Sequence, residues 1–245
     1  VCMVATRTAA MCFNRLVEWE IEKENPRTQD RHRLISKGQG WVVWAICSIA
    51  AIAAAGALNP FCLYWSPLML AVVFFYSLTK RFTAFAHAFL GLALGLAPEG
   101  AWAAVRGNLF DSPEPFILGC AVLFWTFGFD LIYSTLDAEF DRRKDLHSFP
   151  SRYGIPQSLR LAKILHILAV LAFILFGIVA NLGLFYWTAT ITCGIALLWE
   201  HRLASNLDPG SINKAFFQIN ALVSVALFFG IALHYCCLLY TSDAA

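Results

Sequence analysis

The chain has 245 residues, of which 59% are hydrophobic and 14% charged, and its formal net charge is +2. Soluble globular domains carry roughly 45–50% apolar and about 25% charged residues, so these values, with a mean hydropathy of +0.64, exclude an ordinary soluble fold. The small net charge gives no indication of nucleic-acid binding, and we expect an integral membrane protein without a nucleic-acid partner.

The chain opens at Val1 in a helix-like apolar run that continues to Phe13, with no initiator methionine. The run lacks the charged n-region and small-residue cleavage site of a signal peptide. We therefore expect a fragment that begins inside a membrane helix. A long charged stretch, 18–37, follows this partial span.

Seven further apolar segments are each about as long as a bilayer crossing. They lie at 41–58, 61–79, 83–105, 115–136, 161–182, 184–199 and 215–239. Segments this apolar must be helices, because lipid offers no hydrogen-bond partner to a free backbone amide. The predicted fold is all-α: a polytopic membrane helix bundle with about seven full spans plus one partial span, forming a single domain over 1–245.

The connections between these spans alternate between the two sides of the membrane. One side receives 18–37, 80–81, 142–163 and 202–214, and the other receives 59–60, 106–114 and 181–183. Apart from Arg7 and Arg106, every Lys and Arg falls on the first side. The positive-inside rule makes that side cytoplasmic, and we expect the protein to lie in an inner or plasma membrane.

Two rows of polar residues lie on this side. Asn14, Glu18 and Glu22 are spaced i, i+4, i+8 and are predicted to share one face of a helix. Asp130, Tyr133, Asp137 and Asp141 form the second row by the same rule.

Asp130 is the most informative of these residues. It follows the apolar run 124–129, well inside a predicted span. A carboxylate at that depth costs roughly 2.5–3.5 kcal/mol or more. We therefore expect Asp130 to face a cavity and to have a partner there.

Two facing rows of oxygen donors suit Mg²⁺, which takes oxygen ligands and commonly bridges to substrate phosphates. Cations suited to the remaining phosphate charge stand near the rows in the sequence. These are Arg15, Arg27, Arg31, Lys80, Arg81 and Arg142. The alternative, that charges at helix ends are solvated caps, is favoured for residues such as Glu20 and Glu139 but does not explain Asp130. The histidines within spans, His87 and His166 among them, are expected to be satisfied interior groups rather than metal ligands.

At these residues the chain resembles the UbiA family of intramembrane aromatic prenyltransferases, and within it the members similar to 4-hydroxybenzoate polyprenyltransferase. That family carries the motifs Asn-Asp-x-x-Asp-x-x-x-Asp and Asp-x-x-Tyr-x-x-x-Asp-x-x-x-Asp. The second is complete here, whereas in the first Asn14 is kept, Arg15 takes the Asp position, and Glu18 and Glu22 replace the later aspartates. Asp145 stands where the family usually has glycine.

The resemblance implies a nine-helix fold of which the first helix and part of the second are missing. It also implies that Mg²⁺ is held by Asn14, Glu18, Glu22, Asp130, Asp137 and Asp141. Catalytic roles would fall to Asp130, Tyr133, Asp137 and Asp141, and substrate binding to Asn14, Arg15, Arg27, Arg31, Lys80, Arg81 and Arg142.

The implied reaction is Mg²⁺-dependent transfer of a polyprenyl group from a polyprenyl diphosphate to the ring of an aromatic acid. The favoured acceptor is 4-hydroxybenzoate, in ubiquinone-type quinone biosynthesis, and membrane lipid surrounds the prenyl chain. Prenylation of a dihydroxynaphthoate in menaquinone biosynthesis is the alternative.

Other classes of membrane protein fit the sequence less well. A transporter would need polar residues near the midplane of several helices, whereas Asp130 is nearly alone there. A CDP-alcohol phosphotransferase would carry the motif Asp-Gly-x-x-Ala-Arg, which is absent. A purely structural membrane protein would not need two aligned acidic faces.

Overall fold

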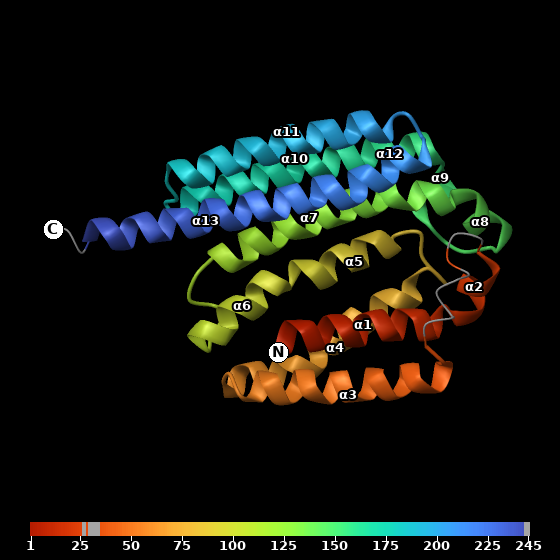
Figure 1. Ribbon diagram of the computed structural model, residues 1–245, viewed down its shortest axis with the longest axis horizontal. Helices are drawn as coiled ribbons and strands as arrows, with labels where there is room; N and C mark the ends of the chain where they lie inside the picture. Colours follow the sequence, from red (N-terminus) through yellow and green to blue (C-terminus); the bar gives the residue numbers. More distant parts are fainter. Residues whose placement is uncertain (26–27, 29–34, 243–245) are drawn as a thin grey trace.

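The computed structural model describes residues 1–25, 28 and 35–242, with side chains described as far as 237. Regular secondary structure in these residues is entirely helical. Figure 1 shows long helices in two groups, one made of α1, α3 and α4 and the other of α7, α10, α11 and α13, with α5 between them. The short helices α2, α8 and α9 gather at one end of the molecule.

The first group comprises α1 (Cys2–Val17), α3 (Lys37–Gly56) and α4 (Pro60–Thr79), with the short helix α2 (Trp19–Glu24) after α1. Local sequence accounts for the starts of α3 and α4. Ser36 and Gln39 form a reciprocal capping box before α3, and the side chain of Asn59 accepts a hydrogen bond from the Cys62 amide before α4. These side chains satisfy amide groups that a helix start leaves without an intrahelical partner.

The next span is broken into α5 (Ala86–Gly95) and α6 (Ala97–Arg106). Pro98 near the start of α6 lacks an amide hydrogen and cannot continue the hydrogen-bond ladder of the preceding helix. The sequence predicts one helix here, and the structure instead has two helices in one apolar crossing, Ala86–Arg106.

The second group contains the longest helices. Its members are α7 (Glu114–Ser134), η2 (Thr135–Asp137), α8 (Ala138–Arg143), α9 (Phe149–Tyr153), α10 (Ile155–Val179), α11 (Leu184–Ala204), α12 (Pro209–Lys214), η3 (Ala215–Ile219) and α13 (Asn220–Ser242). Of the short elements, η2 is a 3₁₀ turn and η3 is a π-helical turn.

Within the described residues, six helical segments are long and apolar enough to cross a membrane. They are Lys37–Gly56, Pro60–Thr79, Ala86–Arg106, Glu114–Arg143, Ile155–Val179 and Pro209–Cys237. The seventh predicted span lies in α11, a helix of 21 residues whose last turns carry Glu200, His201 and Arg202. These three polar residues lower its hydropathy, but the all-α membrane bundle expected from the sequence is confirmed.

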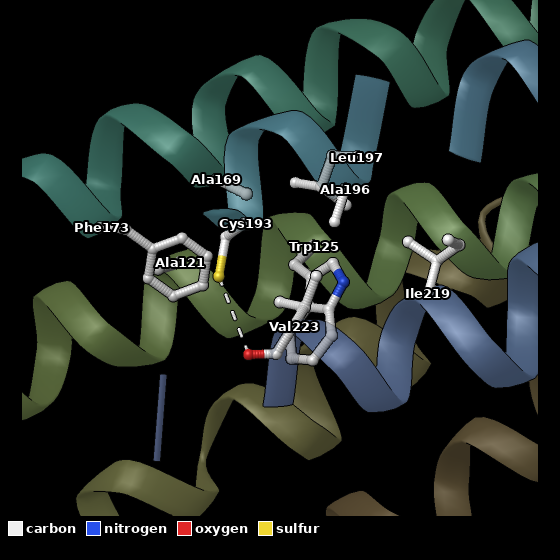
Figure 2. Packing of buried hydrophobic residues seen from close by; sticks show 9 residues of the cluster. All are labelled: Ala121, Trp125, Ala169, Phe173, Cys193, Ala196, Leu197, Ile219 and Val223. Carbon is white, nitrogen blue, oxygen red and sulfur yellow. Dashed lines mark hydrogen bonds between the residues drawn. The ribbon is translucent and has the colours of Figure 1, made fainter. Parts of the chain in front are cut away.

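A core of buried hydrophobic residues joins the helices of the second group (Figure 2). Trp125 of α7, Phe173 of α10, and Cys193 and Leu197 of α11 pack there against Val223 of α13. Several of the remaining core positions are alanine, which lets helix backbones approach closely where no hydrophobic effect drives helices together in lipid.

A buried polar cluster lies beside this core. The carboxylate of Glu200 has no exposed surface, and one of its oxygens lies 3.7 Å from His166 Nδ1. The same His166 nitrogen is 3.0 Å from His201 Nε2, and Trp125 Nε1 donates to Asn220 Oδ1 at 2.8 Å. His166 is therefore a hydrogen-bonded interior group, as the sequence analysis expects.

Glycines form a close seam between α5 and α7. A Cβ added to Gly91 would lie 2.7 Å from the carbonyl oxygen of Leu123, and one added to Gly95 would lie 2.8 Å from that of Gly119. Real Cβ atoms essentially never approach so closely. Only glycine at these positions allows the observed distance between the two helices.

Candidate functional site

A cavity of about 210 Å³ opens where the ends of α1, α4, α5 and α7 meet the short helices α2 and α8. Both sequence motifs contribute to its wall. The predicted site residues that line it are Asn14, Glu18, Glu22, Lys80, Arg81, Asp130, Tyr133, Asp137 and Asp141. Residues from positions 14 and 141 thus meet in one place.

The first row reaches the cavity across a helix break. Helix α1 ends at Val17, Glu18 has φ −91° and ψ 10°, and α2 begins at Trp19. The guanidinium of Arg81 donates from Nη2 to the Val17 carbonyl oxygen at 2.7 Å. This contact satisfies a carbonyl at the end of α1, where the helix leaves it without an internal partner. The continuous helix predicted for 14–22 is therefore wrong, although the three residues still line one cavity.

The second row also crosses a break. Helix α7 ends at Ser134, the 3₁₀ turn η2 follows, and α8 begins at Ala138. A 3₁₀ turn has about three residues per turn instead of 3.6, so the row is not the straight helical face that its spacing predicts. Asp130 and Asp141 nevertheless both face the cavity, and Asp141 is only 3% exposed.

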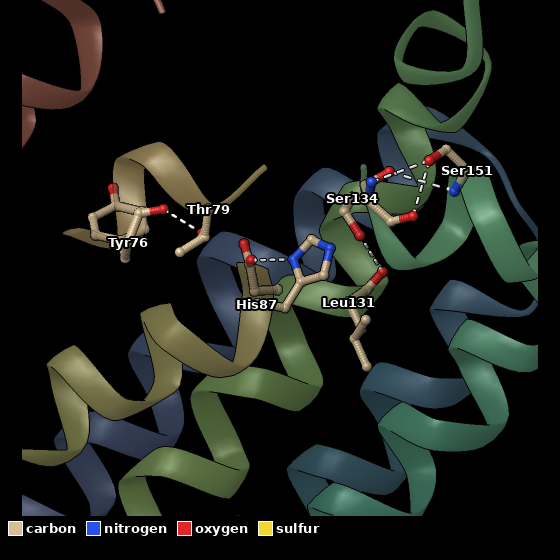
Figure 3. Close-up of polar contacts among 8 residues, drawn as sticks. Tyr76, Thr79, His87, Leu131, Ser134 and Ser151 are labelled. Atoms are coloured by element: carbon tan, nitrogen blue, oxygen red, sulfur yellow. Dashed lines mark hydrogen bonds and ion pairs between the residues drawn. The ribbon is translucent and has the colours of Figure 1, made fainter. Parts of the chain in front are cut away.

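Asp130 has the partner that its depth requires. His87 Nδ1 lies 2.6 Å from Asp130 Oδ2, and the imidazole is buried. Figure 3 shows His87 on α5 pointing toward α7, where Leu131 and Ser134 lie. This short contact fixes the carboxylate at the edge of the cavity.

Three contacts tie together the segments that follow α1, α4 and α7 around the cavity. Asn25 Nδ2 donates to Asp137 Oδ1 at 3.2 Å, and Lys144 pairs with Glu24. The His147 amide donates to the Lys80 carbonyl oxygen at 2.8 Å. The loops after α1 and α8 are thus tied to each other and to the end of α4.

The electrostatics of the cavity centre on Lys80. Burial alone would lower the pKa of Lys80, but the carboxylates of Glu18, Asp141, Asp130 and Asp137 together outweigh that effect and raise it. Burial raises the pKa of Glu18, and the neighbouring Glu22 and Asp141 carboxylates add to the rise, whereas Lys80 and Arg81 oppose it. Five acidic side chains line the cavity beside two basic ones, Lys80 and Arg81, so the cavity can accept further positive charge.

The donor set fits a hard divalent cation. Asp141 Oδ2 is buried with no hydrogen-bond partner, and carboxylate oxygens are the ligands that Mg²⁺ prefers. Within the residues that the structure describes, no three acidic, His or Cys side chains stand close enough to hold a metal ion by themselves. Mg²⁺ is usually bound by one or two carboxylates together with substrate phosphates, so such a preformed cage is not required.

The structure separates the cations expected to bind substrate. Lys80 and Arg81 line the cavity. Arg15 does not, because it follows Asn14 by one residue and so points about 100° away around the helix. Arg142 lies in a neighbouring pocket instead, and Arg27 and Arg31 lie outside the described residues.

His87 and Asn25 also line the cavity, although the sequence does not identify either of them as part of the site. The sequence analysis treats His87 only as a satisfied interior group and does not single out Asn25. The signal for His87 was the same as that for Asp130, a polar side chain inside an apolar span. Asn25 carries no comparable signal, because it lies in a polar loop.

Comparison with known proteins gives consistent results. The model of the UbiA prenyltransferase family matches residues 1–222. A 4-hydroxybenzoate octaprenyltransferase of Marinobacter nauticus is 26% identical over 93% of this chain and 77% of the relative. One of Polynucleobacter asymbioticus is 29% identical over 93% and 79%, respectively.

Two solved structures share the fold. The apo structure of a UbiA homolog from Aeropyrum pernix K1 superposes with a TM-score of 0.86 at 29% identity, covering 95% of this chain and 86% of that one. A structure described in terms of digeranylgeranylglyceryl phosphate synthase gives a TM-score of 0.69 at 18% identity, covering 94% and 82%. The second likeness concerns the fold alone.

Proposed function

Because this chain belongs to the UbiA prenyltransferase family and is a polyprenyltransferase, we propose that it transfers a polyprenyl group to the ring of an aromatic acid, with 4-hydroxybenzoate as the favoured acceptor. The observation that carries the proposal is the meeting of both acidic rows with Lys80 and Arg81 in one cavity. The relatives named 4-hydroxybenzoate octaprenyltransferase support this acceptor. A dihydroxynaphthoate is the second candidate, since it is also an aromatic acid.

From membership of this family we infer that the reaction depends on a divalent metal. In this chain Asn14, Glu18, Glu22, Asp130, Asp137 and Asp141 would hold Mg²⁺. When bound, the ion would neutralise charge on the diphosphate of the prenyl donor. Asp130 would be kept in position by His87, at the 2.6 Å contact.

The remaining roles follow from the side chains around the cavity. The bond between the diphosphate oxygen and the first prenyl carbon would break. The ammonium of Lys80 would stabilise the negative charge that develops on the departing diphosphate. The Tyr133 ring, stacked on Phe216 with a centroid distance of 4.0 Å, would present an aromatic face to the allylic cation. A ring carbon of the acceptor would then form the new bond and release its proton, while Arg81, which lines the cavity, would bind the acceptor carboxylate.

We place the cavity on the cytoplasmic side, because the basic connections lie at that end of the helices. An epitope inserted at Asn206, in the exposed turn after α11, is expected to bind antibody in inside-out vesicles only. Binding in right-side-out vesicles would reverse the proposed orientation.

The reaction can be tested in membranes that contain the expressed protein, with Mg²⁺ and a labelled polyprenyl diphosphate. 4-Hydroxybenzoate and a dihydroxynaphthoate would be offered in parallel, with and without a chelator. We expect prenylated hydroxybenzoate only when the metal is present. Turnover that persists in the chelator would contradict the metal-dependent mechanism, and prenylation of the naphthoate alone would favour the second acceptor.

A matched pair of variants assigns the metal-dependent step to the cavity. Asp141→Asn keeps the shape of a buried side chain but removes its charge, and should lower turnover by about 100-fold or more. Glu139→Gln removes an exposed carboxylate from the same helix and should leave turnover nearly unchanged. Equal losses in both variants would argue against a special role for Asp141.

A further inference from the structure

A second pocket, of about 260 Å³, lies on the loop between α8 and α10. Its lining residues are Arg142, Asp145, Leu146, His147, Ser151 and Arg152. Leu146 also lines the central cavity, so the second pocket and the central cavity lie next to each other and share this residue. None of the acidic residues of the two motif rows lines this second pocket.

The cations of the pocket differ from those next to them in the sequence. Arg143 pairs with Glu139 at 2.7 Å, and Lys144 pairs with Glu24. Arg142 and Arg152, by contrast, have no carboxylate partner among the described residues. Arg142 donates only from Nε to the Ser151 carbonyl oxygen, at 3.4 Å. Its terminal guanidinium nitrogens therefore remain available to a ligand.

His147 adds an imidazole ring to the wall. Its amide is held by the Lys80 carbonyl oxygen at 2.8 Å, which fixes the residue beside the central cavity. Its Nδ1 is buried and has no hydrogen-bond partner. Asp145 places one carboxylate in the same wall, so two guanidinium groups face a single negative charge.

The pocket lies where a membrane span begins. Helix α10, a membrane-spanning segment, starts at Ile155, three residues after Arg152. Tyr153 between them is 44% exposed, and exposed Tyr residues are enriched at the level of lipid headgroups. The two arginines thus lie close to the start of a membrane span, where we expect the phosphate groups of the bilayer surface.

We propose that Arg142, His147 and Arg152 form a binding site for a phosphate group, separate from the site of prenyl transfer. Arginine is suited to this ligand because its planar guanidinium can donate two parallel hydrogen bonds to phosphate oxygens. The phosphate can belong to an anionic phospholipid headgroup or to free phosphate or diphosphate. The site does not depend on the proposed reaction, since it uses no residue of the two motif rows.

The test uses the whole chain in two arms. In the first arm, the protein is placed in nanodiscs of phosphatidylcholine that contain a minor fraction of phosphatidylglycerol. After extraction, the amount of phosphatidylglycerol that remains bound to the protein is measured. In the second, inorganic phosphate or diphosphate is added to the protein in detergent, and the shift in unfolding temperature is measured. Arg152→Gln and His147→Gln are compared with Arg160→Gln, which removes an exposed cation outside the pocket.

We expect Arg152→Gln to weaken binding roughly fivefold, the effect of one cation near an anionic surface, and Arg160→Gln to have much less effect. If the pocket variants lose binding only in the first arm, the ligand is a lipid headgroup. If they lose binding only in the second arm, the ligand is a free anion. If neither pocket variant differs from Arg160→Gln in either arm, the proposal is wrong. His147→Gln keeps the test decisive if Arg152→Gln does not fold.

Discussion

At the scale of single residues, Asp145 adopts a backbone conformation that is more favourable for glycine. Its φ is +54°, in the left-handed region, where an L side chain brings Cβ close to the following carbonyl oxygen. This explains why the resemblance leads one to expect glycine at that position. Aspartate is among the residues that tolerate this conformation best, so the loop keeps its path at a modest cost.

Asp145→Gly should therefore stabilise the protein by about 0.5–1 kcal/mol, because glycine has no Cβ to strain. Asp145→Ala is the matched control, since it also removes the charge but keeps Cβ. The unfolding temperatures of both variants in the same detergent give the comparison. If both change stability equally, the charge and not the backbone is responsible.

Asp130 shows how far prediction reaches at this scale. The cost of a carboxylate in a span predicts a cavity and a partner, and the structure provides both. The identity of the partner could not be predicted from the sequence alone. His87 lies 43 positions earlier in the chain, and no local rule relates two residues at that separation.

At the scale of elements, the two acidic rows show where helical periodicity fails. Neither break contains glycine or proline: Val17, Glu18 and Trp19 meet at one, and Thr135 to Asp137 form the other. The sequence therefore gives no stop signal, and periodicity predicts continuous helices. Contacts from distant residues, such as Arg81 to the Val17 carbonyl oxygen, favour the breaks, and such contacts are not visible in a local window.

The two glutamates of the first row allow a test of their proposed role as metal ligands. Replacing both Glu18 and Glu22 by Asp keeps the charge and should preserve or raise turnover. Replacing both by Gln keeps the length but removes the charge, and should abolish turnover, because a neutral amide is a poor partner for Mg²⁺. The two double variants are compared in the same membrane assay.

The alternative, that these glutamates are only solvated caps, predicts a different result. Surface substitutions usually change stability by no more than about 0.5 kcal/mol, and both double variants would then remain active. An active Gln variant would mean that any metal rests on the row from Asp130 to Asp141 alone.

The seam between α5 and α7 is a second element whose spacing matters to the site. Gly91 follows His87 by one turn of α5, and Gly91→Ala would push Leu123 and α7 away. We expect a loss of stability of about 1–3 kcal/mol and a lower kcat, since the contact between His87 and Asp130 would lengthen. Gly194→Ala is the control, because its Cβ would meet nothing within 4 Å and alanine favours a helix.

Both variants would be followed by thermal unfolding and by turnover. Normal turnover in a destabilised Gly91→Ala protein would show that the close packing of α5 against α7 is not needed for the reaction in the cavity. A loss in Gly194→Ala as large as that in Gly91→Ala would show that close packing at position 91 is not the cause.

At the scale of the whole molecule, the hydropathy pattern predicted the all-α membrane bundle and the approximate position of every long helix. Pattern alone did not reveal the break at Leu96 within one span, nor which helices pack together. Packing partners depend on shape, such as the glycines between α5 and α7, and a one-dimensional pattern of hydropathy carries little of that shape. The pairing of the two motifs is expected from the placement of both rows on one side of the membrane and from the family resemblance, and not from hydropathy.

The connection between α6 and α7, at 107–113, lines neither pocket described above. It begins at Gly107, whose φ of +67° ends α6, and Asp111 is held by Trp102 and Arg106 on the α6 side. The two halves of the protein instead recognise each other through the glycine seam and the polar contacts at the cavity mouth. We therefore expect the peptide link between them to be dispensable. Polypeptides 1–112 and 113–245, translated from separate genes in one cell, should complement each other and regain turnover that neither has alone.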